Sequence, residues 1–582
     1  MVFMSKLRRA VHALVAVSLL AGASARAGRP YRGGAVATAY PPASEAALLM
    51  LKMGGNAVDA AVAAAFVAGV AGPYHNGIGG GGFALLYDAK AKKTEAFDFR
   101  EVAPLGASHD MYLKDGQPAA ELSRDGATSV AVPGAVKGYL EMLKKHGTLS
   151  PSVVLAPAIA LARTGIWVTP KYQSMARLRV PCLAADADAA RLFLRPNPKG
   201  VLDVPEIGTV LKNPELARTL MKIAAQGASA FYSGPIARAI ADTVQRGGGV
   251  LSEKDLAAYK TRTYTPLEGQ YRGYRIAAMP PPSAGGLTVL EVLGQLETLL
   301  PKGYSRADPE AVHVYAEAVR RSYVDRAKYL GDPAFVTIPL GELNSKAHFE
   351  ALAKSIDPQH ATDSKTLLQI PAEAPKPQGT GALPAKNTTH LSVIDKDGNA
   401  VALTTTINYA FGSCRVAKGT GILLNDAMDD FAAKPLTPNA YGLITGEANA
   451  VAPGKVPSSS MSPTLVFQKD APDEVMLAVG SPGGSTIPTT VIQVIENIID
   501  HQMDLTRAVA AGRVHHQYLP DVLVVEKLGL EPATQRALEA RGHRLQSVEA
   551  LGDAEAVYVN PVTHLRYSAS DPRGEGLALG QE

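Results

Sequence analysis

Apolar residues in the first half of the chain recur mostly at helical spacing, and glycine-rich turns separate the helical segments. Residues 44–72 are rich in alanine and predict two helices with a break at 54–56. The run 77-GIGGGGFALLYD-88 predicts a glycine turn leading into a strand, and alternation continues from Thr94 to Phe99. Further helical patterns cover 133–146, 151–164 and 231–260, the last with a glycine stop and a second, short helix capped by Ser252 and Asp255.

The pattern changes in the second half of the chain. A proline-rich turn, 279-MPPPSAGG-286, precedes another helix, and residues 356–387 then show little apolar periodicity. This last segment contains five prolines and predicts an exposed, mobile linker. The chain beyond it is rich in strands, which are expected over 390–394, 400–407, 464–467 and 474–480, with a helix near 486–499.

Length and charge narrow the class of protein. The chain has 582 residues, more than one average domain, and 46% of them are apolar, which is enough to fill a large core. The net charge is +4 and both signs are scattered, so the sequence offers no basic face for nucleic acid. We therefore expect a globular protein with no nucleic-acid partner.

The N-terminus is organised like a signal peptide. Lys6, Arg8 and Arg9 precede a short apolar run, Ala10–Gly22, and small residues suited to cleavage follow as far as Ala27. The run is too short to span a bilayer, and no later stretch is long and apolar enough. We therefore expect residues 1–27 to be removed on export, leaving a periplasmic or secreted protein without a membrane anchor.

Two cysteines, Cys182 and Cys414, lie far apart in the sequence. One disulfide is allowed in an oxidising compartment, but two buried free thiols are about as plausible from the sequence. No cysteine and histidine spacing suits zinc. The glycines of 77–83 follow a helical pattern and precede a strand, the reverse of the order required for a dinucleotide site. We expect no metal and no cofactor.

The hairpin after the predicted linker brings two threonines together. The sequence DKDGN suits a three-residue loop with glycine in the left-handed conformation, and this loop places Asp395 opposite Asn399. Counting back along the two strands then places Thr388 opposite Thr406. Opposed residues of an antiparallel pair lie about 4.5–5.5 Å apart at Cβ, so two hydroxyls are expected to meet where the linker ends.

A threonine in this position can cut its own chain. Its hydroxyl attacks the preceding carbonyl, that of Asn387, and hydrolysis of the resulting ester makes Thr388 a new N-terminus. The freed α-amino group has a reference pKa of about 7.7–8.0, so it can take the hydroxyl proton at neutral pH while Thr406 orients the nucleophile. On its own, however, the hairpin favours an ordinary polar strand pair, because threonine is common in strands.

Motifs along the whole chain resemble those of the γ-glutamyltransferase (γ-glutamyltranspeptidase) family. Around the hairpin they are NTTH (387–390), GILLNDAMDDF (421–431), VPSSSMSPT (456–464) and GSPGGS (480–485). Elsewhere they include GGNAVDAAVA (54–63), GIGGGGF (77–83), DFREVAP (98–104), VPGAVKG (132–138), YRGYRIAAMPPPSAGG (271–286) and HHQYLPD (515–521). The matches run in one order from about residue 34 to the C-terminus, which is far more specific than any single motif.

The resemblance implies a fold and a maturation step. The fold is a mixed α/β N-terminal nucleophile hydrolase, a four-layer αββα sandwich with two central sheets between helical layers. The proenzyme would cut itself between Asn387 and Thr388. The large chain would then be 28–387, ending in the linker 356–387, and the small catalytic chain would be 388–582. The two would stay together as a heterodimer.

The resemblance also implies roles for individual residues. Thr388 matches the nucleophile and Thr406 the threonine that supports it, while Gly483 and Gly484 match the backbone donors of the oxyanion hole. Tyr441, in the loop 435–446, matches a gating aromatic of a lid found in some bacterial members. The positions that match binding of the substrate's carboxylate and amino ends are Arg100, Asn408, Asp430, Ser459 and Ser460.

One position departs from the family pattern. The family usually carries Gln or Glu, which helps to hold the substrate's α-amino group, where this chain has Ala427. The expected activity is transfer of the γ-glutamyl group of glutathione, or of a related γ-glutamyl amide, to water or to an amino acid or peptide. Two alternatives remain open: a glutaryl or cephalosporin acylase of the same fold, which Ala427 suggests, and a processed binding protein without activity.

Overall fold

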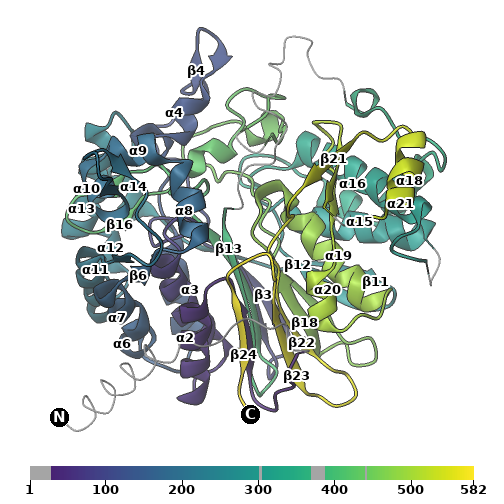
Figure 1. Cartoon of the computed structure of the whole chain (residues 1–582), viewed down its shortest axis with the longest axis horizontal. Coiled ribbons are helices and arrows are strands. Elements are labelled where there is room, and N and C mark those ends of the chain that lie inside the picture. Colours follow the sequence, from purple (N-terminus) through teal and green to yellow (C-terminus); the bar gives the residue numbers. More distant parts are fainter. Residues whose placement is uncertain (1–27, 301–303, 369–386, 440–441, 528) are drawn as a thin grey trace.

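Two β-sheets are stacked face to face between layers of helices (Figure 1). The structure is a computed structural model that describes residues 28–300, 304–368, 387–439, 442–527 and 529–582. The first sheet is seven-stranded, in the spatial order β10 (Arg262–Tyr264), β3 (Lys93–Asp98), β2 (Gly81–Asp88), β14 (Ala400–Thr406), β13 (Thr389–Ile394), β1 (Ala35–Thr38) and β24 (Leu577–Gly580). The second is six-stranded, in the order β11 (Leu267–Tyr271), β12 (Tyr274–Ala278), β17 (Thr464–Phe467), β18 (Val475–Gly480), β22 (Glu555–Val559) and β23 (Arg566–Ser570).

Each central strand is buried on both of its faces. Along β2, Phe83, Leu85 and Tyr87 join the core between the two sheets, whereas Ala84 and Leu86 join the core beneath the helices. Strands covered on both sides need apolar residues at successive positions, which explains the nearly continuous apolar run. The double burial also fixes the pairing register, because a slip by one residue would exchange the two faces.

The helical layers complete the sandwich. Helices α2 (Pro41–Lys52), α3 (Ala57–Ala71) and α5 (Ala135–His146) cover the first sheet. The second sheet is covered by α15 (Gly285–Leu299), α16 (Pro309–Tyr329) and α19 (Ile487–Ile499) (Figure 1). The four-layer arrangement implied by the sequence resemblance is therefore confirmed.

Most elements predicted from the sequence pattern are present. Asn56 caps α3 through the backbone N–H groups of Val58 and Asp59, so the chain breaks where predicted. The helical pattern of 151–164 is divided into α6 (Pro151–Val154) and α7 (Ala156–Thr164), and that of 231–260 into α13 (Gly234–Arg246) and α14 (Glu253–Ala258). The capping box predicted from Ser252 and Asp255 begins α14.

Shorter elements surround this framework. The other helices of the described residues are α4 (Ala120–Arg124), α8 (Pro170–Arg177), α9 (Val180–Ala184), α10 (Ala187–Phe193), α11 (Pro214–Gln226), α12 (Ser229–Tyr232), α17 (Leu340–Leu343), α18 (Lys346–Lys354), α20 (Leu505–Ala510) and α21 (Pro532–Ala540). The small strands are β4 (Leu113–Lys114), β5 (Gln117–Pro118), β6 (Ile166–Trp167), β7 (Arg195–Pro196), β8 (Leu202–Asp203), β9 (Val210–Leu211), β15 (Val416–Ala417), β16 (Ile422–Leu423), β19 (Val514–His515), β20 (Leu523–Glu526) and β21 (Leu545–Val548).

The first part of the predicted linker packs against the body of the protein. Ile356 is buried, and Leu367 packs against the core of the second sheet. The backbone N–H of Ser364 donates to Asp521 over 3.0 Å, and its hydroxyl accepts from Arg320. Residues 356–368 are therefore attached to the body at a few points, although more than half of them are exposed as predicted, and 369–386 lie outside the described residues.

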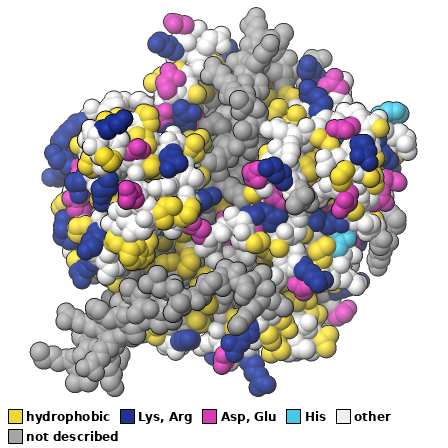
Figure 2. Space-filling model, viewed as in Figure 1, with side chains coloured by type: hydrophobic (Ala, Val, Ile, Leu, Met, Phe, Trp, Pro, Cys, Tyr) yellow, Lys and Arg dark blue, Asp and Glu magenta, His cyan; other side chains and the backbone are white. Residues whose placement is uncertain are grey.

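The described surface has mixed charge. Basic and acidic side chains are interspersed over the face shown in Figure 2. No helix within the described ranges combines the length and the hydrophobicity needed to cross a bilayer. The predicted signal peptide, 1–27, lies outside these ranges.

Candidate active site

The hairpin of β13 and β14 has the predicted register. The N–H of Asp395 donates to the carbonyl of Asn399 over 3.0 Å, and Gly398 adopts the left-handed conformation with φ +88°. The strands pair from Ile394 opposite Ala400 to Thr389 opposite Thr405. One step further, the Thr388 hydroxyl donates to the Thr406 hydroxyl over 3.1 Å. The meeting of these two hydroxyls at the open end of the hairpin is therefore confirmed.

Thr406 is held so that it can accept this hydrogen bond. Its hydroxyl oxygen also accepts from the backbone N–H of Asn408 over 2.9 Å. Thr388 and Thr406 are both buried, and Thr388 has φ +88°, a conformation rarely adopted by a β-branched residue. Strain of this kind persists only where the surroundings fix the backbone, and it concentrates at functional sites.

The carbonyl that precedes Thr388 is held from the second sheet. In the uncut chain, the N–H of Gly483 donates to the carbonyl oxygen of Asn387 over 3.2 Å. Gly483 lies between the end of β18 and the start of α19, with φ +135°, and Gly484 has φ +58°. A Cβ at Gly483 would lie 2.4 Å from the Thr486 hydroxyl oxygen, so glycine is required there. The Gly483 N–H thus lies where negative charge would develop if Thr388 attacked this carbonyl.

Arg100 and Glu101 are fully buried and form an ionic cluster with Asp430, which is partly exposed. The Arg100 guanidinium donates to Glu101 over 2.7 Å and pairs with the Asp430 carboxylate. Burial disfavours the charge of Arg100, but the two carboxylates outweigh it and raise its pKa. Burial raises the pKa of Asp430, and Arg100 only partly offsets it. Asp430 lines the cavity beside Thr388, whereas Arg100 lies behind it as the partner of Asp430.

The proline-rich turn supports the serine pair. The backbone N–H of Ser459 donates to the carbonyl of Pro282 over 3.1 Å, and the N–H of Ala284 donates back to the Ser459 carbonyl over 2.8 Å. The hydroxyl of Ser460 accepts from the Arg326 guanidinium over 2.8 Å. The proline-rich turn and α16, both upstream of Thr388, therefore hold the two serines in place.

Arg326 is a site residue that the sequence reasoning missed. It lies on α16 and lines the cavity with a side chain that is almost fully buried. Its Nε has no hydrogen-bond partner among the described residues, and no carboxylate there forms an ion pair with it. Burial lowers its pKa, although an arginine remains charged at neutral pH. The cavity wall thus carries a cation that forms no direct ion pair with the described residues, although the nearby Asp430 carboxylate favours its charge.

These groups converge on one cavity. It is open to solvent and is lined by Arg326, Thr388, Thr406, Asn408, Asp430, Asn439, Leu443, Thr445, Ser458, Ser459, Ser460, Met461, Gly484 and Ile487. A second hollow lies beside α3, α7 and α11 and is mostly apolar, without a hydroxyl nucleophile. The cavity at Thr388 is therefore the better candidate for an active site. Tyr441, the predicted gating aromatic, lies outside the described residues.

The amide of Asn408 and the methyl of Ala427 have different surroundings. The Asn408 side chain donates to the carbonyl of Asp426 over 3.1 Å while lining the cavity. Ala427 is fully buried in a small apolar cluster with Met428 and Phe431. The cavity therefore has no polar side chain from position 427.

His390 supports the hairpin rather than acting as a base. One ring nitrogen lies 2.8 Å from the Thr404 hydroxyl and the other 3.0 Å from the Ser392 hydroxyl. Burial lowers the pKa of His390 to about 3, so the ring is neutral at physiological pH. Both nitrogens are already hydrogen-bonded, so His390 is not placed to take the proton of the Thr388 hydroxyl.

The fold and the site together define a class of protein. Two facing sheets between helical layers, with a hydroxyl residue at the start of a central strand, form the N-terminal nucleophile hydrolase architecture. The solved structure of cephalosporin acylase from Bacillus halodurans has the same fold, with a TM-score of 0.81 and 28% identity over 97% of this chain and 99% of that one.

The sequence comparisons identify the family. A family profile described as Gamma-glutamyltranspeptidase matches residues 43–581. A glutathione hydrolase proenzyme from Escherichia coli (strain K12) is 42% identical over 93% of this chain and 90% of that protein. One from Pseudomonas sp. (strain A14) is 41% identical over 94% of each. The chain belongs to the γ-glutamyltranspeptidase family.

Proposed function

We propose that this enzyme is a γ-glutamyltransferase and glutathione hydrolase that matures by cutting itself between Asn387 and Thr388. The observation that most directly supports this proposal is the geometry around the Asn387–Thr388 peptide bond. The Thr388 hydroxyl is aligned by Thr406, and the adjoining Asn387 carbonyl accepts from Gly483. The names of the glutathione hydrolase proenzymes from E. coli and Pseudomonas support both the activity and the precursor.

Maturation follows from the two contacts. Thr388 Oγ attacks the carbonyl carbon of Asn387, and the N–H of Gly483 stabilises the negative charge on the carbonyl oxygen. The C–N bond then breaks, the nitrogen takes a proton, and an ester joins Asn387 to the Thr388 oxygen. Water hydrolyses this ester, leaving the Asn387 carboxylate and a free Thr388 amine. The resulting chains, 28–387 and 388–582, remain associated through the shared core.

The same atoms then act on the substrate. The α-amine of Thr388, with a reference pKa of about 7.7–8.0, accepts the hydroxyl proton as Oγ attacks the γ-amide carbon of the donor. Gly483 and Gly484 hold the oxyanion, and the leaving amine departs with the proton. Water or the amine of an amino acid or peptide then takes the γ-glutamyl group from the ester, restoring the hydroxyl.

The polar wall of the cavity suits an amino acid end. Asp430 and Asn408 hold the α-amino group, and Ser459 and Ser460 bind the α-carboxylate. Arg100 keeps Asp430 in place in the uncut chain and is the arginine that the resemblance assigns to the carboxylate. Arg326, which contacts Ser460, supplies a further positive charge on the carboxylate side.

An acylase with a different acyl group is the second candidate. Ala427 offers no polar contact to an α-amine, and the B. halodurans cephalosporin acylase shares the fold. Comparing turnover of γ-glutamyl-p-nitroanilide and glutaryl-p-nitroanilide separates the two, because the second probe lacks the amine. We expect faster γ-glutamyl turnover; faster glutaryl turnover would support the acylase, and processed protein inactive on both would support a binding protein.

Self-cleavage and export are tested on the purified protein. Denaturing, reducing gels should show two chains for the wild type and one for Thr388→Ala. The small chain should begin Thr-Thr-His-Leu, and the large chain should begin near residue 28 in material recovered from the periplasm or medium. A single wild-type chain would contradict the maturation mechanism, and a retained N-terminus would contradict export.

A further inference from the structure

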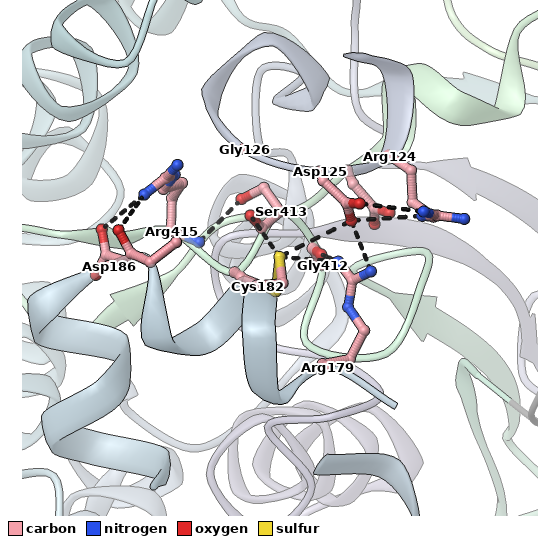
Figure 3. Close-up of a disulfide and its surroundings, with 12 residues drawn as sticks. Arg124, Asp125, Gly126, Arg179, Cys182, Asp186, Gly412, Ser413 and Arg415 are labelled. Atoms are coloured by element: carbon pink, nitrogen blue, oxygen red, sulfur yellow. Dashed lines mark hydrogen bonds and ion pairs between the residues drawn. A yellow bond between two sulfur atoms is a disulfide. The ribbon is translucent and has the colours of Figure 1, made fainter. Parts of the chain in front are cut away.

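The two cysteines, which the sequence left open, form a disulfide between distant segments. Cys182 belongs to the short helix α9, and Cys414 follows the loop that leaves β14. Their Cα atoms lie 5.8 Å apart, within the ordinary range for a disulfide. Figure 3 shows the bridge among side chains from both segments.

The proposed cut falls between these two cysteines. Cys182 lies upstream of Asn387 and Cys414 downstream of Thr388. We propose that the disulfide joins the large and small chains of the mature enzyme covalently and positions the loop that carries Asn408; this inference rests on the self-cleavage proposed above.

The loop needs support because its backbone is strained. Between β14 and Cys414, three residues other than glycine have left-handed conformations: Asn408 with φ +72°, Phe411 with φ +57° and Cys414 with φ +58°. Such conformations are unfavourable for residues with a Cβ and persist where surrounding contacts fix them. After cleavage, contacts from the large chain can fix this loop only while the two chains keep their relative positions.

Arg179, three residues before Cys182, makes the neighbouring large-chain contacts. Its guanidinium donates to the carbonyl of Gly412 over 2.9 Å and pairs with Asp125 over 2.6 Å. It also lies 5.2 Å from the centre of the Tyr409 ring, a cation–π distance. The disulfide therefore completes a clamp in which one segment upstream of the cut holds both ends of the loop, at Tyr409 and at Cys414. Figure 3 shows Arg179 and Cys182 of this segment beside Gly412 and Ser413.

The loop connects this clamp directly to the cavity. The backbone N–H of Tyr409 donates to the Asp426 carboxylate over 2.8 Å, and the Asn408 amide donates to the Asp426 carbonyl over 3.1 Å. Asn408 lines the cavity, and its N–H reaches Thr406. A loosened loop would therefore weaken the binding of the donor through Asn408, while Thr388 stays on its own strand.

Reduction of the folded protein offers a second test of the bridge. Cys414 is fully buried, but Cys182 is partly exposed, so we expect a small reductant to open the bridge from the Cys182 side. Reduction places two thiols where the bridge was and leaves Arg179 and the rest of the clamp in place. Reduced wild-type enzyme is therefore a direct counterpart of the variants below.

Denaturing gels with and without reductant test the covalent link. We expect one band at full-chain mobility without reductant and two bands with it, for protein alkylated before denaturation. Two bands under both conditions would overturn the link while leaving self-cleavage intact. One band under both conditions would overturn self-cleavage, and the link between chains with it.

Kinetics with γ-glutamyl-p-nitroanilide test the positioning role. Complete loss of the hydrogen bond between Asn408 and the donor's charged α-amino group corresponds to a rise in KM of about 12- to 150-fold, so a loosened loop should raise KM by up to that factor, and kcat should change less. We expect this rise in Cys182→Ser, in the double variant Cys182→Ser/Cys414→Ser, and in wild-type enzyme treated with reductant. The double variant should be insensitive to reductant, which controls for other effects of the reagent. An unchanged KM in reduced wild-type enzyme, or an equal fall of kcat with KM constant, would overturn the positioning role.

Discussion

Replacing Thr406 by valine tests whether the hydroxyl pair drives cleavage. Valine keeps the shape of threonine but removes the oxygen that accepts from the Thr388 hydroxyl over 3.1 Å and from the Asn408 N–H over 2.9 Å. Both contacts are buried, and a buried donor left without its acceptor costs about 1–3 kcal/mol. If the attacking hydroxyl bears that cost in the transition state, self-cleavage slows by about 5- to 150-fold.

The neighbouring residue provides a matched control. Thr405 is equally buried on the same strand, but its hydroxyl accepts from Tyr139 over 2.8 Å and donates to the Gly81 carbonyl over 3.1 Å. Thr405→Val should lower stability by a similar amount without slowing the cut. A time course of small-chain appearance after synthesis, read on reducing gels, measures the rate. Cleavage of Thr406→Val at the wild-type rate, or equal slowing in both variants, would refute the reasoning.

Two further changes probe the oxyanion donor and the buried histidine. Gly483→Ala should slow cleavage and turnover by about 10²–10³-fold, because the added Cβ would lie 2.4 Å from the Thr486 hydroxyl oxygen and displace the N–H. The control variant Gly398→Ala, at the hairpin tip, should still cut at the normal rate. If the two variants were slowed equally in gel and activity assays, the oxyanion role of Gly483 would be contradicted. The pKa of His390 is about 3 when folded against 6.5 ordinarily, so its contribution to stability is complete above pH 6.5 and is lost as the pH falls toward 3. At pH 5 this lowers the free energy of unfolding by about 2 kcal/mol. Urea unfolding at pH 7 and pH 5 should therefore show a smaller decrease in stability for His390→Gln than for the wild type. Identical decreases would count against a neutral, buried ring.

Local rules predicted the hairpin and its threonine pair well. The loop from Asp395 to Asn399 sets the register, and the register alone places Thr388 against Thr406. The helix breaks at Asn56 and Ser252 were predictable for the same reason, since their capping contacts lie within a few residues. The stacking of two sheets, in contrast, came from the family resemblance, because periodicity does not say which buried strands face each other.

Features that depend on contacts between distant segments were missed or left open. Arg326 reaches the cavity from α16, and nothing in its local sequence separates a cavity-facing arginine from a surface one. The pairing of Cys182 with Cys414 depends on α9 lying beside the loop after β14. Residues 356–368 have a composition typical of linkers, yet the contact between Ser364 and Asp521 attaches them to the body.

The contact between Gly483 and Asn387 links maturation to catalysis. In the uncut chain, the Gly483 N–H already donates to a carbonyl of the protein's own backbone, next to the hydroxyl that attacks it. A donor amide needs its carbonyl at that same N–H and its reacting carbon at the same hydroxyl. One N–H cannot serve both carbonyls in full, so the uncut chain would block its own site. The proposed cleavage would both free the Thr388 amine and open the Gly483 N–H to substrate. We therefore expect the substrate to be an amide that takes the place of the Asn387–Thr388 bond, with its selectivity set by the polar wall around Asp430 and Ser460.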